Sequence, residues 1–215
     1  MLYLAYKACH GCEPWHAFGI MEFHENQLYH IYNRGNNKQR IFFCPDNYIY
    51  FLQKVRLHIK PNCDILAYSL MPNHFHFIVN ADFRTIQTKK KAGQERNVLS
   101  EGIRNLLSSY TQAINKQQRK TGSLFQQNTK SKCLDDSDVN YAPVAFHYVH
   151  QNAFKAGLVD RIEDWPYSSF RDYAGIRAGT LCNKRLAFEL LGLSENTFYE
   201  DSYAMINHDF ITKIY

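Results

Sequence analysis

Alternating hydrophobic and polar positions predict four short strands in the middle of the chain. Residues 27–35 (QLYHIYNRG) combine β-branched and aromatic residues with a closing glycine, which is typical of a strand that runs into a turn. Residues 63–71 and 74–81 are largely apolar and flank the tight turn Pro72–Asn73, so we expect a hairpin. Residues 121–135 predict the fourth strand.

Apolar residues at helical spacing predict three long helices and a short one. The first covers residues 44–59, and the second covers 97–118, where the apolar positions form one stripe. The third covers 139–157 and ends at a glycine. Residues 184–191 predict the short helix, whereas the basic, weakly hydrophobic stretch 84–96 predicts a loop.

The resulting order of elements is βαββαβ followed by a helix. This order is typical of the ferredoxin-like (RRM-like) fold of the α+β class, an antiparallel sheet with helices on one face. The added C-terminal helix carries a tyrosine and is the element that would cover the open face. We expect an N-terminal extension over residues 1–22, the functional domain over 23–175, and a C-terminal extension over 176–215.

Composition limits the class of protein. Hydrophobic residues make up 45% of the 215 residues, which indicates a globular chain with one well-buried domain. No apolar run approaches the roughly 20 residues that a membrane span needs, and no signal-peptide pattern is visible. The six cysteines are mostly isolated, which favours a reducing compartment over a disulfide framework. We therefore expect a cytoplasmic protein without a membrane partner.

The net charge of +5 is unevenly distributed along the chain. Residues 84–96 contain three consecutive lysines and a single acid, and residues 116–132 contain basic residues and no acid. Two alternatives stay open, because such stretches are either solvated loops or contacts for a polyanion such as nucleic acid. On the second alternative the candidate DNA-binding residues are Arg34, Lys89, Lys90, Lys91, Arg119, Lys120, Lys130, Lys132 and Lys155.

Two histidines stand one residue apart in the strand predicted over 74–81. Residues at positions i and i+2 of a strand point to the same side, so His74 and His76 are neighbours on one face. Two adjacent imidazoles disfavour each other's protonated form and make a natural chelate for a divalent ion. The alternative is that both are structural polar residues in a packed strand.

The last long helix carries a candidate nucleophile. Tyr148 and Asn152 are four residues apart and share a helix face, which Lys155 continues. A tyrosine beside a metal-bound phosphate can act as a nucleophile, with the amide of Asn152 as a third metal ligand and the lysine balancing phosphate charge. The alternative is a tyrosine that only packs at the helix boundary. Tyr110 belongs to the apolar stripe of the preceding helix, so we expect it to pack in the core.

Four segments together resemble a known family. The stretches YHIYNRGNN, AYSLMPNHFHFIV, GSLFQ…KSK and YVHQNAFKAGLV…WPYSS are similar to the REP-associated tyrosine transposases, which are single-tyrosine HUH enzymes, from about residue 27 to 175. The resemblance implies that His74 and His76 are metal ligands, Tyr148 the nucleophile and Asn152 the third ligand. It also implies a Mg²⁺ or Mn²⁺ cofactor and a bacterial, cytoplasmic protein, monomeric or homodimeric. Its implied reaction is the nicking and transfer of single-stranded DNA beside a hairpin, through a 5′-phosphotyrosine.

The chain departs from that family's pattern at two places. The family usually has Asn-Pro where this chain has Asn152–Ala153, and often an arginine and an aromatic where this chain has residues 127–129. The main alternative function is a catalytically inactive nucleic-acid-binding protein on the same fold. A two-histidine phosphoesterase would need a His-x-Ser/Thr motif in each of two strands, and a single-stranded RNA-binding domain would have aromatics in place of the histidines.

Overall fold

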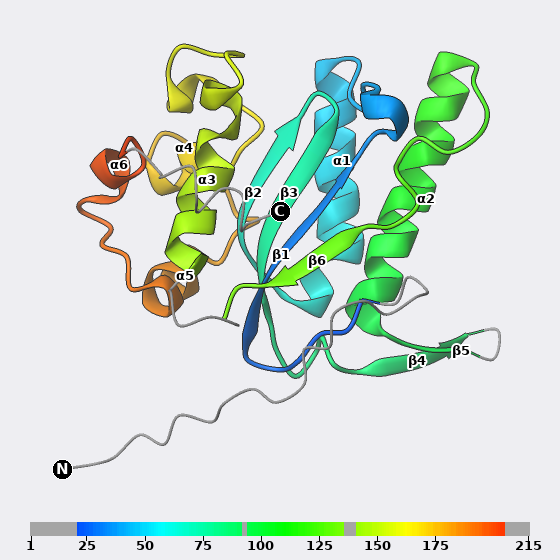
Figure 1. Ribbon diagram of the computed structural model, residues 1–215, viewed down its shortest axis with the longest axis horizontal. Helices are drawn as coiled ribbons and strands as arrows, with labels where there is room; N and C mark the ends of the chain where they lie inside the picture. Colours follow the sequence, from blue (N-terminus) through cyan, green and yellow to red (C-terminus); the bar gives the residue numbers. More distant parts are fainter. Residues whose placement is uncertain (1–20, 92–93, 136–140, 205–215) are drawn as a thin grey trace.

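The structure is a computed structural model that describes residues 21–91, 94–135 and 141–204. Its centre is a four-stranded antiparallel sheet with the spatial order β2-β3-β1-β6 (Figure 1). The strands are β1 (Gln27–Arg34), β2 (Asp64–Met71), β3 (His74–Ala81) and β6 (Lys130–Cys133). Because β3 lies between β1 and β2, the unit that links β1 to β2 through a helix is a split βαβ, and the predicted ferredoxin-like, α+β fold is confirmed.

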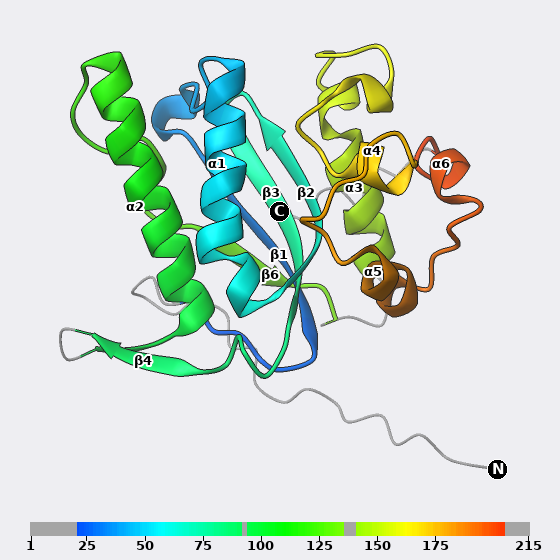
Figure 2. The same ribbon diagram turned by 180° about the vertical axis from the view of Figure 1, so that it is seen from behind.

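Helices α1 (Pro45–His58) and α2 (Val98–Gln118) cover one face of the sheet (Figure 2). The odd-numbered residues of β3 point to this face and pack in the larger of two hydrophobic cores. Bulky aromatic side chains of α1, α2 and β3 fill that core, among them Phe51, Phe75 and Tyr110. The odd positions of β3 are therefore committed to packing, and the histidines at its even positions face the other way.

Helix α3 (Tyr141–Lys155) lies on the opposite face, over β2 and part of β3. Its small residues Ala142 and Ala145 pack in a second core with Leu66, Ala67 and others. A register shift between β2 and β3 at this point turns both Leu66 and Ala67 towards α3. α3 does not extend over β1 and β6, so Tyr32, Lys130 and Lys132 on this face stay at least partly exposed, whereas His30 is buried.

The side of α3 that faces away from the sheet is also buried, because the segment that follows α3 packs against it. This segment contains α4 (Phe170–Tyr173), α5 (Lys184–Leu191) and α6 (Phe198–Asp201), and its apolar side chains join the second core. The amide of Gln151 donates to the carbonyl oxygen of Ser202 at 2.7 Å. Residues 176–204, which belong to the predicted C-terminal extension, thus pack on the side of α3 that faces away from the sheet.

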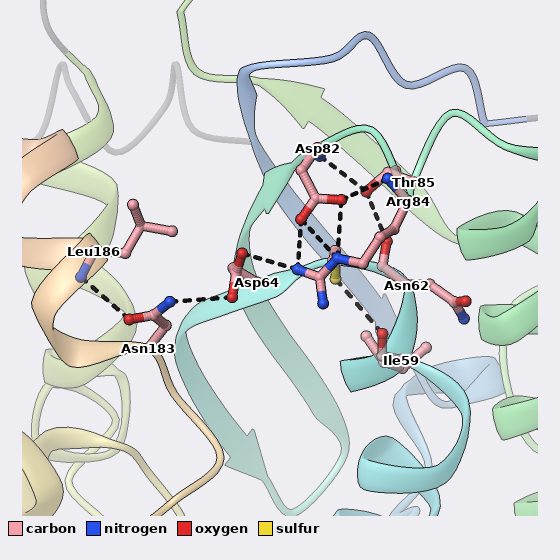
Figure 3. A network of polar contacts seen from close by, with 9 residues as sticks. Ile59, Asn62, Asp64, Asp82, Arg84, Thr85, Asn183 and Leu186 are labelled. Carbon is pink, nitrogen blue, oxygen red and sulfur yellow. Dashed lines mark hydrogen bonds and ion pairs between the residues drawn. The ribbon is translucent and has the colours of Figure 1, made fainter.

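A polar network ties this segment to the sheet (Figure 3). The guanidinium of Arg84 bonds the carboxylate of Asp64 at 2.9 Å and also that of Asp82. Asp64 accepts a further bond, at 3.1 Å, from the amide of Asn183, whose oxygen caps the first turn of α5. The start of β2, the end of β3 and the start of α5 are therefore joined through one carboxylate.

Two predicted elements differ from the structure. The loop predicted over 84–96 contains a two-stranded ribbon, β4 (Thr88–Lys91) and β5 (Gln94–Asn97), which lies apart from the main sheet (Figure 1). The strand predicted over 121–135 is reduced to β6. The Asn33 side chain bonds the carbonyl of Gln126 and the hydroxyl of Thr129, and these bonds replace a regular ladder there.

The other boundaries agree with the predictions within a few residues. Single 3₁₀ turns occur at Asn36–Lys38, Lys60–Asn62 and Ile162–Asp164. None of the described helices combines the length and the apolar character that crossing a membrane requires. The predicted N-terminal extension lies outside the described residues, except for 21 and 22.

Candidate active site

The histidine pair lies on the face of the sheet that α3 partly covers. In the strand register, His76 is directly opposite Tyr32 of β1, and His74 is opposite Arg34. On the other side of β1, Tyr32 is opposite Lys130 of β6. A row of Lys130, Tyr32 and His76 therefore crosses three strands of the sheet on one face, with a cation at its outer end.

Helix α3 brings the candidate nucleophile to this row. The ring of Tyr148 lies edge-on to that of His76, with 6.5 Å between the centroids, and the two histidine rings lie 4.9 Å apart. A cavity of about 670 Å³ opens between sheet and helix. Its walls bring together these predicted residues: Arg34, His74, His76, Lys130, Tyr148, Asn152 and Lys155.

Each histidine is held by a neighbour through its Nδ1 atom. His74 Nδ1 lies 2.6 Å from the side-chain oxygen of Asn73, which can only accept, so Nδ1 carries the proton. His76 Nδ1 lies 2.9 Å from Nε2 of His30, a buried residue of β1. In both histidines Nε2 is then the atom with which the ring would reach a ligand in the cavity.

Burial keeps the two histidines neutral. Desolvation and the nearby Arg34 guanidinium lower the pKa of His74 to about 4. Complete burial, with His30 and His74 beside it, holds the pKa of His76 well below its usual range. Metal binding requires a neutral imidazole, and at neutral pH both rings are in that charge state.

The donor set fits a catalytic divalent ion better than a structural one. In the described part of the chain, no cluster of three or more histidine, cysteine or acidic side chains is placed to hold a metal. His74, His76 and the amide oxygen of Asn152 would supply three neutral ligands at most. Such a set leaves coordination positions of the ion open and its charge unbalanced. Phosphate oxygens would fill these positions and balance the charge, which is common in Mg²⁺ and Mn²⁺ sites at phosphates.

Three lysines lie near the histidines and Tyr148, and partial burial lowers the pKa of two of them. The Lys155 ammonium lies 5.8 Å from the centre of the Tyr148 ring, and partial burial lowers the pKa of Lys155. Lys132 is opposite His30 on the same face of the sheet, and desolvation lowers its pKa as well. Lys155 and Lys130 line the cavity with the histidines and the tyrosine, and Lys132 lies two residues further along β6, an arrangement that favours an anion.

The remaining predicted DNA-binding residues do not line this cavity. Lys89, Lys90 and Lys91 lie on the β4–β5 ribbon, and Arg119 and Lys120 follow the C-terminal end of α2. A second cavity, of about 630 Å³, runs along α2 and has Arg96 and Arg104 in its walls. Gln126 and Asn128 line both cavities, so the second adjoins the first.

Tyr110 packs in the hydrophobic core, as predicted. Its ring is fully buried among Phe42, Phe51 and Phe125, on the far face of the sheet from the histidines. Its hydroxyl donates to the carbonyl oxygen of Ile41 at 2.8 Å. A tyrosine so placed has a structural role.

The sequence interpretation missed His30, Tyr32 and Asn73. The signal for the first two was present, because His30, Tyr32 and Arg34 alternate along one predicted strand in the same way as His74 and His76 do along another. Placing them beside the pair requires the register between the two strands, which is a property of the fold. Asn73 was assigned only to the turn.

Comparisons with known proteins bear on the fold. No protein-family model matches the chain, and no curated protein matches it by sequence. A solved structure of a REP-associated tyrosine transposase bound to a REP hairpin matches with a TM-score of 0.51 and 16% sequence identity. The match covers 80% of this chain and 94% of that one, and it shows that the two share a fold.

Proposed function

We propose that this protein is a metal-dependent enzyme that nicks single-stranded DNA beside a hairpin and transfers the cut strand through a 5′-phosphotyrosine. The observation that carries the proposal is the cavity in which Tyr148 meets two neutral histidines on a strand, with Arg34, Lys130 and Lys155 in the same walls. The shared fold with a transposase bound to a DNA hairpin supports this choice over other phosphoryl-transfer reactions.

Tyr148 is the nucleophile in this proposal. Its hydroxyl oxygen attacks the scissile phosphorus, the bond from phosphorus to the 3′ oxygen breaks, and the 5′ phosphate stays on the tyrosine. The phenol proton is released to solvent, and the leaving oxygen takes up a proton to become a 3′ hydroxyl. A 3′ hydroxyl attacking the phosphotyrosine reverses these steps and joins a strand, so one tyrosine serves both cutting and transfer.

The other side chains hold charge and position. His74, His76 and Asn152 would hold Mg²⁺ or Mn²⁺, which when bound polarises the scissile phosphate. Lys155, close to the Tyr148 ring, stabilises negative charge on the phenolate and the phosphate. Arg34 and Lys130, on the walls of the same cavity, orient the phosphates on either side of the cut.

More distant cations would hold the rest of the DNA. Lys89 of the ribbon is opposite Arg96 across the two strands, so two cations lie side by side there. A phosphate backbone along the ribbon would be attracted to both. Lys90 on the ribbon, together with Arg119 and Lys120 after α2, extends the set of phosphate contacts beyond the cavity.

A nicking assay tests the proposal. A labelled oligonucleotide with a single-stranded segment beside a hairpin is incubated with the protein and Mn²⁺, and the products are separated under denaturing conditions. We expect a cut strand and a covalent protein–DNA adduct that Tyr148→Phe abolishes. Binding of the hairpin without any cut or adduct, across hairpins of varied sequence, would favour the catalytically inactive DNA-binding protein instead.

A further inference from the structure

A third buried histidine adjoins the candidate metal ligands. His30 lies on β1 with no exposed surface, and its Nε2 atom is 2.9 Å from Nδ1 of His76. The two rings are nearly parallel and meet edge to edge, with centroids 5.0 Å apart and an interplanar angle of 19°, and the ring of Tyr32 lies 4.7 Å from that of His30. This contact restricts both the rotation and the proton position of His76.

The hydrogen bond has two possible directions with opposite consequences. If His76 Nδ1–H donates to His30, the lone pair of His76 is on Nε2, where it can bind a metal. If His30 Nε2–H donates to His76, the neutral ring of His76 carries its proton on Nε2 and cannot bind there. The choice between these two tautomers therefore decides whether His76 is a ligand at all.

We propose that His30 is a positioning residue that holds His76 in the form protonated at Nδ1, so that Nε2 is the ligand atom. The inference rests on the proposed function, in which His76 binds the metal. His74 has the corresponding arrangement, because its Nδ1 must donate to the side-chain oxygen of Asn73. With both rings protonated at Nδ1, both present Nε2, and the two can bind one ion together.

Nuclear magnetic resonance of the metal-free protein tests the tautomer directly. Long-range proton–nitrogen spectra of the histidine-labelled protein distinguish a protonated ring nitrogen from an unprotonated one, and the His76 signals are assigned by their loss in His76→Gln. We expect Nδ1 of His76 to be protonated and Nε2 to be unprotonated. The reverse assignment in the wild-type protein would overturn the proposal, and this measurement needs no variant of His30 to fold.

Two variants of nearly equal size then test the acceptor at position 30. His30→Gln places an amide oxygen near the position of Nε2, whereas His30→Met has the same length and no comparable acceptor. Mn²⁺ affinity is measured from the electron paramagnetic resonance signal of the free ion. We expect His30→Met to weaken Mn²⁺ binding by about tenfold or more, and His30→Gln to restore most of it. Equal affinity of wild type and His30→Met would overturn the proposal.

The two measurements separate this inference from the proposed function. If the wild-type protein binds no Mn²⁺, the metal part of the proposed function fails, and the tautomer spectrum alone decides the role of His30. If the wild type binds Mn²⁺ and His76 is protonated at Nε2, the proposed function keeps its metal and the inference about His30 is wrong.

Discussion

The ring of Tyr148 stands edge-on to the ring of His76, 6.5 Å from centroid to centroid, although the two residues lie on different elements far apart in the chain. Their separation is set by how α3 packs on the sheet, through Ala142 and Ala145 on one side and the C-terminal segment on the other. The candidate nucleophile is thus positioned by a helix packed on two sides and not by a loop, which suits a reaction that depends on orientation.

Replacing this tyrosine should separate binding from chemistry. Tyr148→Phe removes the attacking oxygen and leaves the ring, so we expect unchanged affinity for a hairpin oligonucleotide and loss of the covalent adduct. Adduct formation is measured on a denaturing gel, and binding is measured by fluorescence anisotropy. The matched control is Tyr110→Phe, which loses only the bond to the Ile41 carbonyl.

The control makes its own prediction. Tyr110→Phe should keep both binding and adduct formation while lowering the free energy of unfolding by about 1 kcal/mol, the usual contribution of one hydrogen bond. An adduct that persists in Tyr148→Phe and disappears in Tyr110→Phe would reverse the assignment of the nucleophile.

Removing the histidine pair should remove metal binding. At a Mn²⁺ concentration 100-fold above its dissociation constant, a bound ion raises the free energy of unfolding by about 2.7 kcal/mol. We expect this increase in the wild-type protein and none in the double variant His74→Ala, His76→Ala. Urea unfolding with and without Mn²⁺ measures it. The same Mn²⁺-dependent increase in the double variant would show that the ion binds elsewhere.

Local patterns predicted much of the fold and part of the site. The shared face of His74 and His76 follows from the two-residue period of a strand, and the burial of Tyr110 follows from the apolar stripe of its helix; the structure confirms both. The βαββαβ order was readable because the two helices on the sheet keep a helical apolar period, and because β2 and β3, which are buried on both faces, are short apolar runs around a turn.

The features that were missed depend on contacts between distant segments. The β4–β5 ribbon lies apart from the main sheet, so its polar strands TKKK and QERN carry no hydrophobic period to reveal them. His30 meets His76 only through the pairing of β1 with β3. The burial of Gln151 on the second side of α3 depends on the segment that follows it, which sequence reasoning had separated from the domain.

Charge on the ribbon should appear in the salt dependence of DNA binding. Each phosphate contact contributes about 0.7 to 0.9 to the slope of log affinity against log salt concentration. Lys89 and Lys90 are exposed, so Lys89→Gln with Lys90→Gln should reduce that slope by about 1.4 to 1.8 without affecting the fold. Binding is measured over a series of salt concentrations.

The control for the ribbon removes the same charge from helix α1. Lys54→Gln with Arg56→Gln alters helix α1, which covers the face of the sheet away from the histidines. This variant should keep the wild-type slope. Equal slopes for the two double variants would mean that the ribbon does not contact DNA.

Buried neutral histidines should make the fold sensitive to acid. His150 of α3 is fully buried, bonds the Ser169 hydroxyl at 2.7 Å, and has a pKa held well below 6.5 by desolvation and by His147. Below pH 6.5 the unfolded chain therefore takes up a proton at this residue that the folded protein does not. The free energy of unfolding should fall with decreasing pH by about 1.4 kcal/mol per unit for each such histidine. The stabilisation is fully present above the unfolded pKa and is lost in the acidic range beneath it.

His150→Gln keeps a group that can bond Ser169 and removes the proton uptake, so its stability should fall less steeply between neutral pH and about pH 5.5. Urea unfolding of the metal-free protein across this range measures both slopes, and identical slopes would show that His150 takes up its proton equally in the folded and the unfolded state.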